Sequence, residues 1–242
     1  MKNNTIIAYT DGSSRGNPGP GGWGAVLWYP DNTVLELGGR GDNTTNNKME
    51  LMAAIRAIQG AGEVAAKMTI YTDSKYVREG ITTWVFGWQK NGWQTKAKKD
   101  VSNKELWIKL FDAVRMREKH GAIEWVLVPG HSGAAGNERA DAIATKYADM
   151  EEVALYVGSY EEYDTDLVAP DKKTLEVQAK KRSVARARSN AKAYLYLSLV
   201  EGKVMRHLTW AECETRVKGK KAKFKKALSA ENEKEILNEW NV

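Results

Sequence analysis

The chain has 242 residues, a formal net charge of +6 and 42% hydrophobic residues. This length fits one large domain, or a domain of about 150 residues with a smaller one, and the positive charge favours a polyanionic partner. The single cysteine, Cys213, excludes an intramolecular disulfide and is typical of a reducing compartment.

The first half of the chain alternates between strand and helix patterns, after an N-terminus without an apolar signal core. The expected elements are strands at 5–10, 22–29, 33–39, 67–72 and 123–128, and helices at 47–60, 74–79, 103–119 and 137–148, with a Trp-rich stretch at 84–93. Three antiparallel strands followed by strand–helix alternation predict an α/β fold, a five-stranded mixed sheet with flanking helices. No apolar stretch is long enough to span a bilayer, so we expect a cytoplasmic protein without a membrane partner.

The composition changes abruptly after Ala148. Residues 150–171 contain seven acidic residues and no Lys or Arg, whereas residues 172–226 contain seventeen Lys or Arg. We predict a catalytic domain over 1–149, a solvated acidic linker over 150–171 and a separate basic domain over 172–242.

The basic domain has the pattern of a small α+β fold. Residues 172–193 predict a basic helix or arm, and residues 194–200 and 204–208 a strand pair around the turn Glu201-Gly202. Thr209 and Glu212 have the spacing of a capping box at the start of a helix through about Val217. A third strand at 222–228 and a last helix from 229 to 240 complete the domain.

Four acidic residues are the most informative positions. Asp11 and Asp73 each close an apolar run and follow a threonine, so two neighbouring strands can present both carboxylates at one sheet edge. Glu50 and Asp141 each lie near the start of a predicted helix. Any one of them alone is typical of a surface group or a helix cap. Clustered carboxylates repel one another unless cations hold them, and hard oxygen ligands select Mg²⁺ or Mn²⁺.

Four sequence motifs occur in order along residues 5–148. They are Tyr-Thr-Asp-Gly-Ser with Gly-Asn-Pro-Gly-Pro-Gly-Gly-Trp-Gly-Ala, Thr-Thr-Asn-Asn-Lys-Met-Glu-Leu-Met-Ala-Ala, Thr-Asp-Ser-Lys-Tyr-Val, and Gly-His-Ser-Gly with Gly-Asn-Glu-Arg-Ala-Asp. Through them the segment resembles the bacterial-type ribonuclease H catalytic domain. The resemblance implies an endonuclease that cuts the RNA strand of an RNA–DNA hybrid and leaves 5′-phosphate and 3′-hydroxyl ends. A non-catalytic hybrid-binding protein is the alternative, and the four intact acids argue against it.

The resemblance also implies roles at the active site. It makes Asp11, Glu50, Asp73 and Asp141 the ligands of two Mg²⁺ ions, for which Mn²⁺ can substitute, with Asp11 bridging both ions. A lone histidine is usually a surface residue, but the Gly-His-Ser-Gly context of His131 implies a proton shuttle. The partner implied is an RNA–DNA hybrid, and we expect the protein to act as a monomer.

Further residues match family positions that contact the hybrid. Ser14, Asn17, Asn46 and Asn47 match positions at 2′-hydroxyls and base edges, where turn and cap chemistry is the alternative explanation. Lys75 stands where many relatives carry Gln, and lysine donates but does not accept. The remaining matches are two positions at a DNA-strand phosphate, Thr45 and Asn103, and the basic protrusion, with Trp84, Trp88, Lys90 and Trp93.

The C-terminal domain is similar over roughly 50 residues to the hybrid-binding domain of eukaryotic ribonucleases H and viroplasmin-like proteins. A Trp-x-x-Cys spacing and a Lys-Phe-Lys-Lys run carry this resemblance. It implies that Trp210 and Phe224 stack on sugar or base while Lys223, Lys225 and Lys226 bind phosphates. A structural appendage or a module that docks a protein partner is the alternative.

Overall fold

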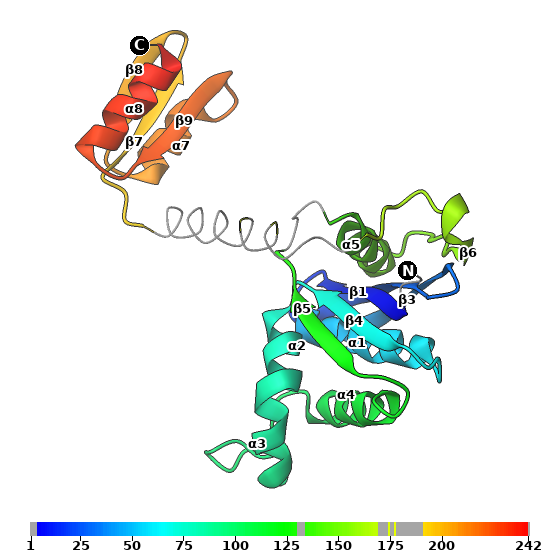
Figure 1. Ribbon diagram of the computed structural model, residues 1–242. Coiled ribbons are helices and arrows are strands. Elements are labelled where there is room, and N and C mark those ends of the chain that lie inside the picture. Colours follow the sequence, from blue (N-terminus) through cyan, green and yellow to red (C-terminus); the bar gives the residue numbers. More distant parts are fainter. Residues whose placement is uncertain (1–3, 130–133, 169–173, 175–176, 178–190, 242) are drawn as a thin grey trace. The chain divides into compact units, whose positions relative to one another are not determined.

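The fold is given by a computed structural model, which describes residues 4–129, 134–168, 174, 177 and 191–241. The chain divides into two compact units, Met1–Gln178 and Ala179–Val242 (Figure 1). Among the helices described here, none is both long and apolar enough to cross a membrane.

The first unit is built on a six-stranded mixed sheet with the strand order β5-β4-β1-β2-β3-β6. Its strands are β1 (Thr5–Ser14), β2 (Gly19–Trp28), β3 (Thr33–Thr44), β4 (Lys67–Thr72), β5 (Ile123–Leu127) and β6 (Val157–Ser159). β1, β2 and β3 are antiparallel neighbours, whereas β4 pairs in parallel with β1 and β5 in parallel with β4. The predicted α/β class is confirmed, and β6 is a strand that the sequence did not predict.

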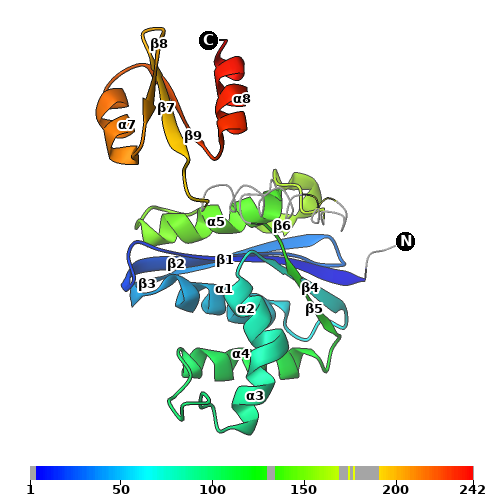
Figure 2. The same ribbon diagram turned by 90° about the vertical axis from the view of Figure 1, so that its left-hand side faces the viewer.

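Helices cover both faces of this sheet. They are α1 (Asn46–Ala61), α2 (Lys75–Glu79), the π-helix η1 (Gly80–Trp84), α3 (Val85–Lys90), α4 (Lys104–Arg117) and α5 (Ala135–Ala148). Figure 2 shows α1 and α4 on one side of the sheet and α5 on the other. One apolar core, with the fully buried Trp107, lies on the α1 side, and a second, which includes Tyr9 and Ile143, lies under α5.

The acidic segment after α5 belongs to the first unit, which corrects the prediction of a solvated linker over 150–171. Its strand β6 pairs antiparallel with β3, a short 3-10 helix η2 (Tyr160–Glu162) follows, and Leu167 is fully buried. Tyr156, Tyr160 and Tyr163 pack against the core beneath α5. The apolar side chains between the acids thus fix the segment to the sheet, while residues 169–171 lie outside the described part.

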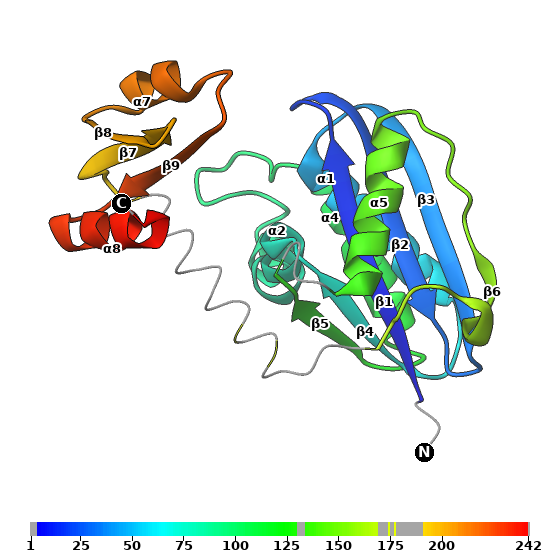
Figure 3. The same cartoon turned by 90° about the horizontal axis from the view of Figure 1, so that it is seen from above.

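The second unit is a three-stranded antiparallel sheet with a helix on each face. The strands β7 (Leu195–Val200), β8 (Lys203–His207) and β9 (Ala222–Ala227) have the order β8-β7-β9. The helices α7 (Trp210–Val217) and α8 (Ala230–Trp240) lie on opposite sides of this sheet (Figure 3). The predicted strands and helices are confirmed, and so is the capping box of Thr209 and Glu212. The predicted basic arm over 172–193 lies almost wholly outside the described residues.

Candidate active site

Two carboxylates meet at the edge shared by the parallel strands β1 and β4. Thr10 and Thr72 are register partners, so Asp11 and Asp73 follow at equivalent positions on neighbouring strands. Asp11 is only 8% exposed, and its Oδ1 accepts a 2.7 Å hydrogen bond from the backbone N–H of Gly12. The predicted side-by-side placement of these two acids is what the strand register produces.

Glu50 reaches the same place because α1 packs directly on β1 at Gly12. A Cβ atom built on Gly12 would lie 2.2 Å from the backbone N of Glu50, so only glycine permits this approach. The Glu50 carboxylate accepts a 2.8 Å hydrogen bond from Asn46 Nδ2 and a second one from the Ser74 hydroxyl. Thr45 caps the start of α1 through its side-chain oxygen, which fixes the first turn that carries Asn46.

The fourth acid arrives from the other face of the sheet. Gly24 pairs with Asp11 across β1 and β2, and a Cβ on Gly24 would lie 2.3 Å from the carbonyl O of Ala140 in α5. This close approach brings Asp141 over Asp11. Asn137, one turn earlier on α5, is 3% exposed, and its Oδ1 has no hydrogen-bond partner among the described residues.

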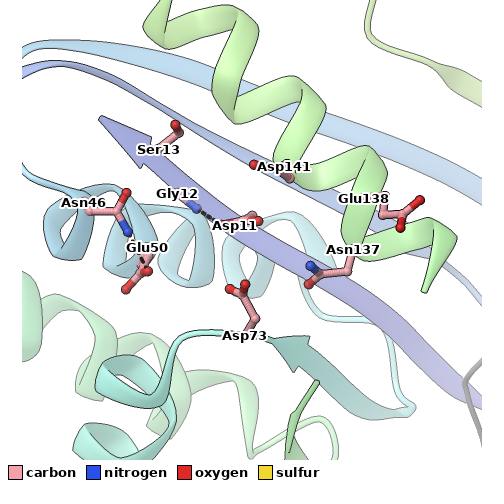
Figure 4. A pocket seen from close by; sticks show the side chains of 9 residues that line it. All are labelled: Asp11, Gly12, Ser13, Asn46, Glu50, Asp73, Asn137, Glu138 and Asp141. Carbon is pink, nitrogen blue, oxygen red and sulfur yellow. Dashed lines mark hydrogen bonds between the residues drawn. The ribbon is translucent and has the colours of Figure 1, made fainter. Parts of the chain in front are cut away.

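These side chains line one cavity of about 200 Å³ (Figure 4). Its lining residues are Asp11, Gly12, Ser13, Asn46, Glu50, Asp73, Asn137, Glu138 and Asp141. In the close-up, Asp73 points toward Asp11, with Glu50 coming from α1 and Asp141 from α5. Four elements that are far apart in the sequence therefore supply one acidic pocket.

Ionisation of the carboxylates in this pocket is unfavourable, because they are buried and repel one another. Burial, followed by the charges of Asp73 and Asp141, raises the pKa of Asp11 to about 8. Burial also raises the pKa of Glu50, although the Ser74 hydroxyl opposes that shift. No three His, Cys, Asp or Glu side chains in the described residues are already grouped so that they could hold a metal ion. The carboxylates of the pocket and the unpartnered Asn137 Oδ1 nevertheless form a set of oxygen donors that fits a hard divalent cation. To bind the cation, the carboxylates would have to turn toward it.

The sequence prediction missed Asn137 and Glu138 as pocket residues. Both lie in the segment Asn-Glu-Arg-Ala-Asp that pointed to Asp141. On a helix, residues four apart face the same way, so the spacing from Asn137 to Asp141 was a usable signal. The proposed proton shuttle, His131, lies outside the described residues.

The predicted substrate residues fall into three groups. Asn46 lines the pocket itself. The second group lies outside the pocket lining: Ser14 ends β1, Asn17 lies on the β1–β2 connection, and Asn47 and Lys75 lie in the first turns of α1 and α2, with Asn17, Asn47 and Lys75 exposed.

The protrusion residues form the third group. Trp84, Trp88 and Trp93 are half-buried, and Trp88 packs edge-on against Trp107 with the ring centroids 5.4 Å apart. These indoles therefore contribute to packing, whereas Lys90 is exposed. Asn103, at the start of α4, donates a 3.1 Å hydrogen bond to the hydroxyl of Tyr76 in α2.

The second unit carries an exposed aromatic pair. Trp210 is 39% and Phe224 49% exposed, and their ring centroids are 5.4 Å apart. Along β9 successive side chains alternate between faces, so Lys226 shares the face of Phe224, whereas Lys223 and Lys225 lie on the α8 face. The Lys225 ammonium accordingly pairs with Glu239 of α8 at 2.6 Å. Lys223 and Lys225 thus lie on the opposite face of the sheet from the aromatic pair, and the phosphate contacts of the three lysines stay a prediction.

The fold is therefore an α/β domain in which a buried aspartate on β1 lies with three other acids in one pocket suited to a divalent cation. The chain belongs to the RNase H family, whose model matches residues 3–149. It is an enzyme of that family, which is generally divalent-metal dependent and comprises nucleases acting on RNA–DNA hybrids.

Curated relatives and solved structures agree with this assignment. Ribonuclease H of Francisella tularensis subsp. novicida is 52% identical over 145 residues, which are 60% of this chain and 91% of the relative. Ribonuclease H of Francisella philomiragia subsp. philomiragia is 51% identical over the same length. The crystal structure of LC9-RNase H1, a type 1 RNase H with the type 2 active-site motif, is 30% identical with a TM-score of 0.55 and covers 72% of this chain and 84% of its own.

Proposed function

We propose that this enzyme is an endonuclease that hydrolyses the RNA strand of RNA–DNA hybrids and leaves 5′-phosphate and 3′-hydroxyl ends. Asp11, Glu50, Asp73 and Asp141 would hold two divalent cations, Mg²⁺ with Mn²⁺ able to substitute. The observation that carries the proposal is the convergence of these four carboxylates, from β1, α1, the β4 edge and α5, on one pocket around the buried Asp11.

Phosphodiester hydrolysis is difficult because a water molecule must attack an anion and an oxyanion must leave. Divalent cations supply a more acidic water and charge neutralisation at both oxygens. The chain itself supplies orientation. Gly12 N–H fixes one oxygen of Asp11, and Ser74 and Asn46 hold both oxygens of Glu50. Asn137 Oδ1 is a buried oxygen without a hydrogen-bond partner in the described residues, so it is available to a cation or a donor group in the pocket.

Substrate choice requires recognition of a 2′-hydroxyl, the group that separates RNA from DNA. Asn46 lies at the pocket and bonds to Glu50, so a single side chain can link sugar recognition to the acidic centre. Asn17 and Asn47, exposed on the neighbouring loop and helix start, extend the polar surface away from the pocket.

The experiment compares four end-labelled substrates: an RNA–DNA hybrid, duplex RNA, duplex DNA and single-stranded RNA. Each is incubated with the full chain in Mg²⁺, in Mn²⁺ and in excess EDTA. We expect internal cleavage of the RNA strand of the hybrid alone, dependent on the cation, with products that carry 5′-phosphates. Cleavage of the hybrid at an unchanged rate in EDTA would reject the metal site, and equal cleavage of duplex RNA would reject the substrate assignment.

We also propose that the second unit binds hybrid and tethers the enzyme to it. The exposed Trp210–Phe224 pair, with Lys226 on the same face, supports this because aromatic faces and lysines are the usual contacts to nucleic-acid bases and phosphates. The alternative is a surface that docks a protein partner. If the second unit binds hybrid, its contribution to hybrid binding should fall steeply as the salt concentration rises. If it docks a protein instead, removal of the second unit should leave hybrid binding unchanged.

A further inference from the structure

Glu36 of β3 is a buried carboxylate outside the pocket with several hydrogen-bond donors. Its side chain has no exposed surface. Arg139 Nε donates to Glu36 Oε1 at 2.6 Å and Arg139 Nη2 to Glu36 Oε2 at 2.7 Å. The Tyr163 hydroxyl donates to Oε1 at 2.5 Å, and the backbone N–H of Tyr156 donates to Oε2 at 2.9 Å. We call these four residues the Glu36 clamp.

The clamp joins three parts of the chain. Glu36 comes from the sheet, Arg139 from α5, and Tyr156 and Tyr163 from the segment after α5. Arg139 also donates a 3.1 Å bond to the carbonyl O of Ala154, so the helix and the segment are tied twice. On α5, Arg139 stands between two pocket-lining residues, Glu138 and Asp141.

Helix α5 lies very close to the sheet where the strands carry glycines. Cβ atoms on Gly22 and Gly24 would lie 2.2 Å and 2.3 Å from carbonyl oxygens of α5, and one on Gly38 would lie 2.4 Å from the Tyr147 ring. The glycines leave room for the side chains of Tyr147 and Ile143, which a Cβ on Gly38 would meet at 2.4 and 2.6 Å. This packing holds α5 against the sheet, and the clamp adds directional hydrogen bonds to it.

Different contacts hold the two ends of α5. At its C-terminal end Arg40 donates to the carbonyl oxygens of Tyr147 and Ala148 at 3.0 and 3.1 Å. The N-terminal half, with the pocket residues Asn137 and Asp141, is held by the clamp. The segment that supplies the tyrosines is itself anchored, because β6 pairs with β3 and Tyr160 stacks on Trp28 at 4.3 Å.

We propose that Glu36 and Tyr163 are positioning residues of the active site, which hold α5 so that Asp141 and Asn137 face Asp11. The segment 153–167, which lies beyond the stretch matched by the family model, is thereby part of the catalytic unit. This inference rests on the proposed metal site at those residues. Partners that orient ligands indirectly typically change metal affinity or activity by about 10- to 100-fold when they are removed.

The test uses the full chain with Tyr163→Phe, which removes one hydroxyl, and Glu36→Gln, which keeps the shape of the side chain. Glu152→Gln, at an exposed acid just before that segment, is the charge-matched control for Glu36→Gln. Three quantities are measured well below the melting temperature: amide hydrogen exchange of α5, Mn²⁺ affinity by calorimetry, and the Mg²⁺ concentration that gives half-maximal cleavage.

We expect faster exchange over the first half of α5, Mn²⁺ affinity lower by about 10-fold, and a raised Mg²⁺ requirement with little change in KM for the hybrid. The control should match the wild type. If both variants melt earlier but keep wild-type α5 exchange and Mn²⁺ affinity, the clamp only stabilises the fold and the inference is rejected. Should Glu36→Gln fail to fold, Tyr163→Phe alone decides. Wild-type protein that neither binds Mn²⁺ nor requires Mg²⁺ would instead reject the proposed metal site, and α5 exchange would still test the clamp.

Discussion

Replacing Gly12 by alanine should damage the active site through a displacement of α1. The new Cβ would lie 2.2 Å from the backbone N of Glu50 and 2.5 Å from the carbonyl C of Met49. Both are backbone atoms, so no side-chain rotation relieves the clash. Restoring ordinary contact near 3.4 Å requires α1 to move by about 1.2 Å, and Glu50 moves with it.

A misplacement of about 1 Å at a catalytic group can cost about 100-fold in rate. Overpacking of this kind costs about 1–3 kcal/mol of stability, which corresponds to a fall in melting temperature of about 2–12 °C for a unit of this size. Initial rates on a labelled hybrid and thermal melts measure both effects. Gly87→Ala is the matched control, because a Cβ at Gly87 meets nothing within 4 Å. Wild-type turnover in Gly12→Ala would refute the argument that this glycine sets the position of Glu50.

Three further outcomes are expected. Trp210→Ala combined with Phe224→Ala should weaken binding of long hybrids by up to ~100-fold through loss of a tethered second site. Turnover on short hybrids should be unchanged, and the binding defect should be smaller at high salt. An equal loss on short and long hybrids in gel-shift and rate assays would contradict tethering. His131→Ala should slow turnover by ~100-fold without abolishing it, in line with the loss of one proton-transfer group; an undiminished rate from pH 6 to 9 would leave His131 without a role. Burial alone would raise the pKa of Glu36, but hydrogen bonds from Arg139 and Tyr163 outweigh it and lower the pKa below its usual 4.5. The stability that Glu36 contributes is therefore present above that value and is lost as pH falls through the lower folded pKa. Thermal melts of the wild type and of Glu36→Gln should accordingly converge in acid.

The sequence predicted the parts of the fold whose signals are local. Apolar runs ending in Thr-Asp gave β1 and β4, and the parallel register then placed Asp11 beside Asp73. The spacing of Thr209 and Glu212 alone predicted the start of α7. Motif resemblance supplied what spacing could not, namely that Glu50 and Asp141 belong to the same pocket.

The misses depended on partners far away in the sequence. Net charge suggested a solvated linker after α5, but Tyr163 bonds to Glu36, 127 residues earlier, and Leu167 buries its side chain completely. The acids between residues 151 and 166 are exposed, while the apolar residues between them fix the segment to the sheet. The ion pair of Lys225 with Glu239 of α8 likewise depends on a residue that is distant in the sequence. A domain boundary drawn at Asp149 would therefore cut through the catalytic unit.

The central claim is that the four-carboxylate pocket performs hydrolysis of the RNA strand. The most direct measurement compares the wild type with Asp11→Asn for cleavage and for binding of one labelled hybrid, in Mg²⁺. The substitution keeps the side-chain volume but weakens metal ligation, so we predict that cleavage is lost while the hybrid is still bound. Wild-type-like cleavage by Asp11→Asn would contradict the account, because the residue at the centre of the pocket would then be dispensable.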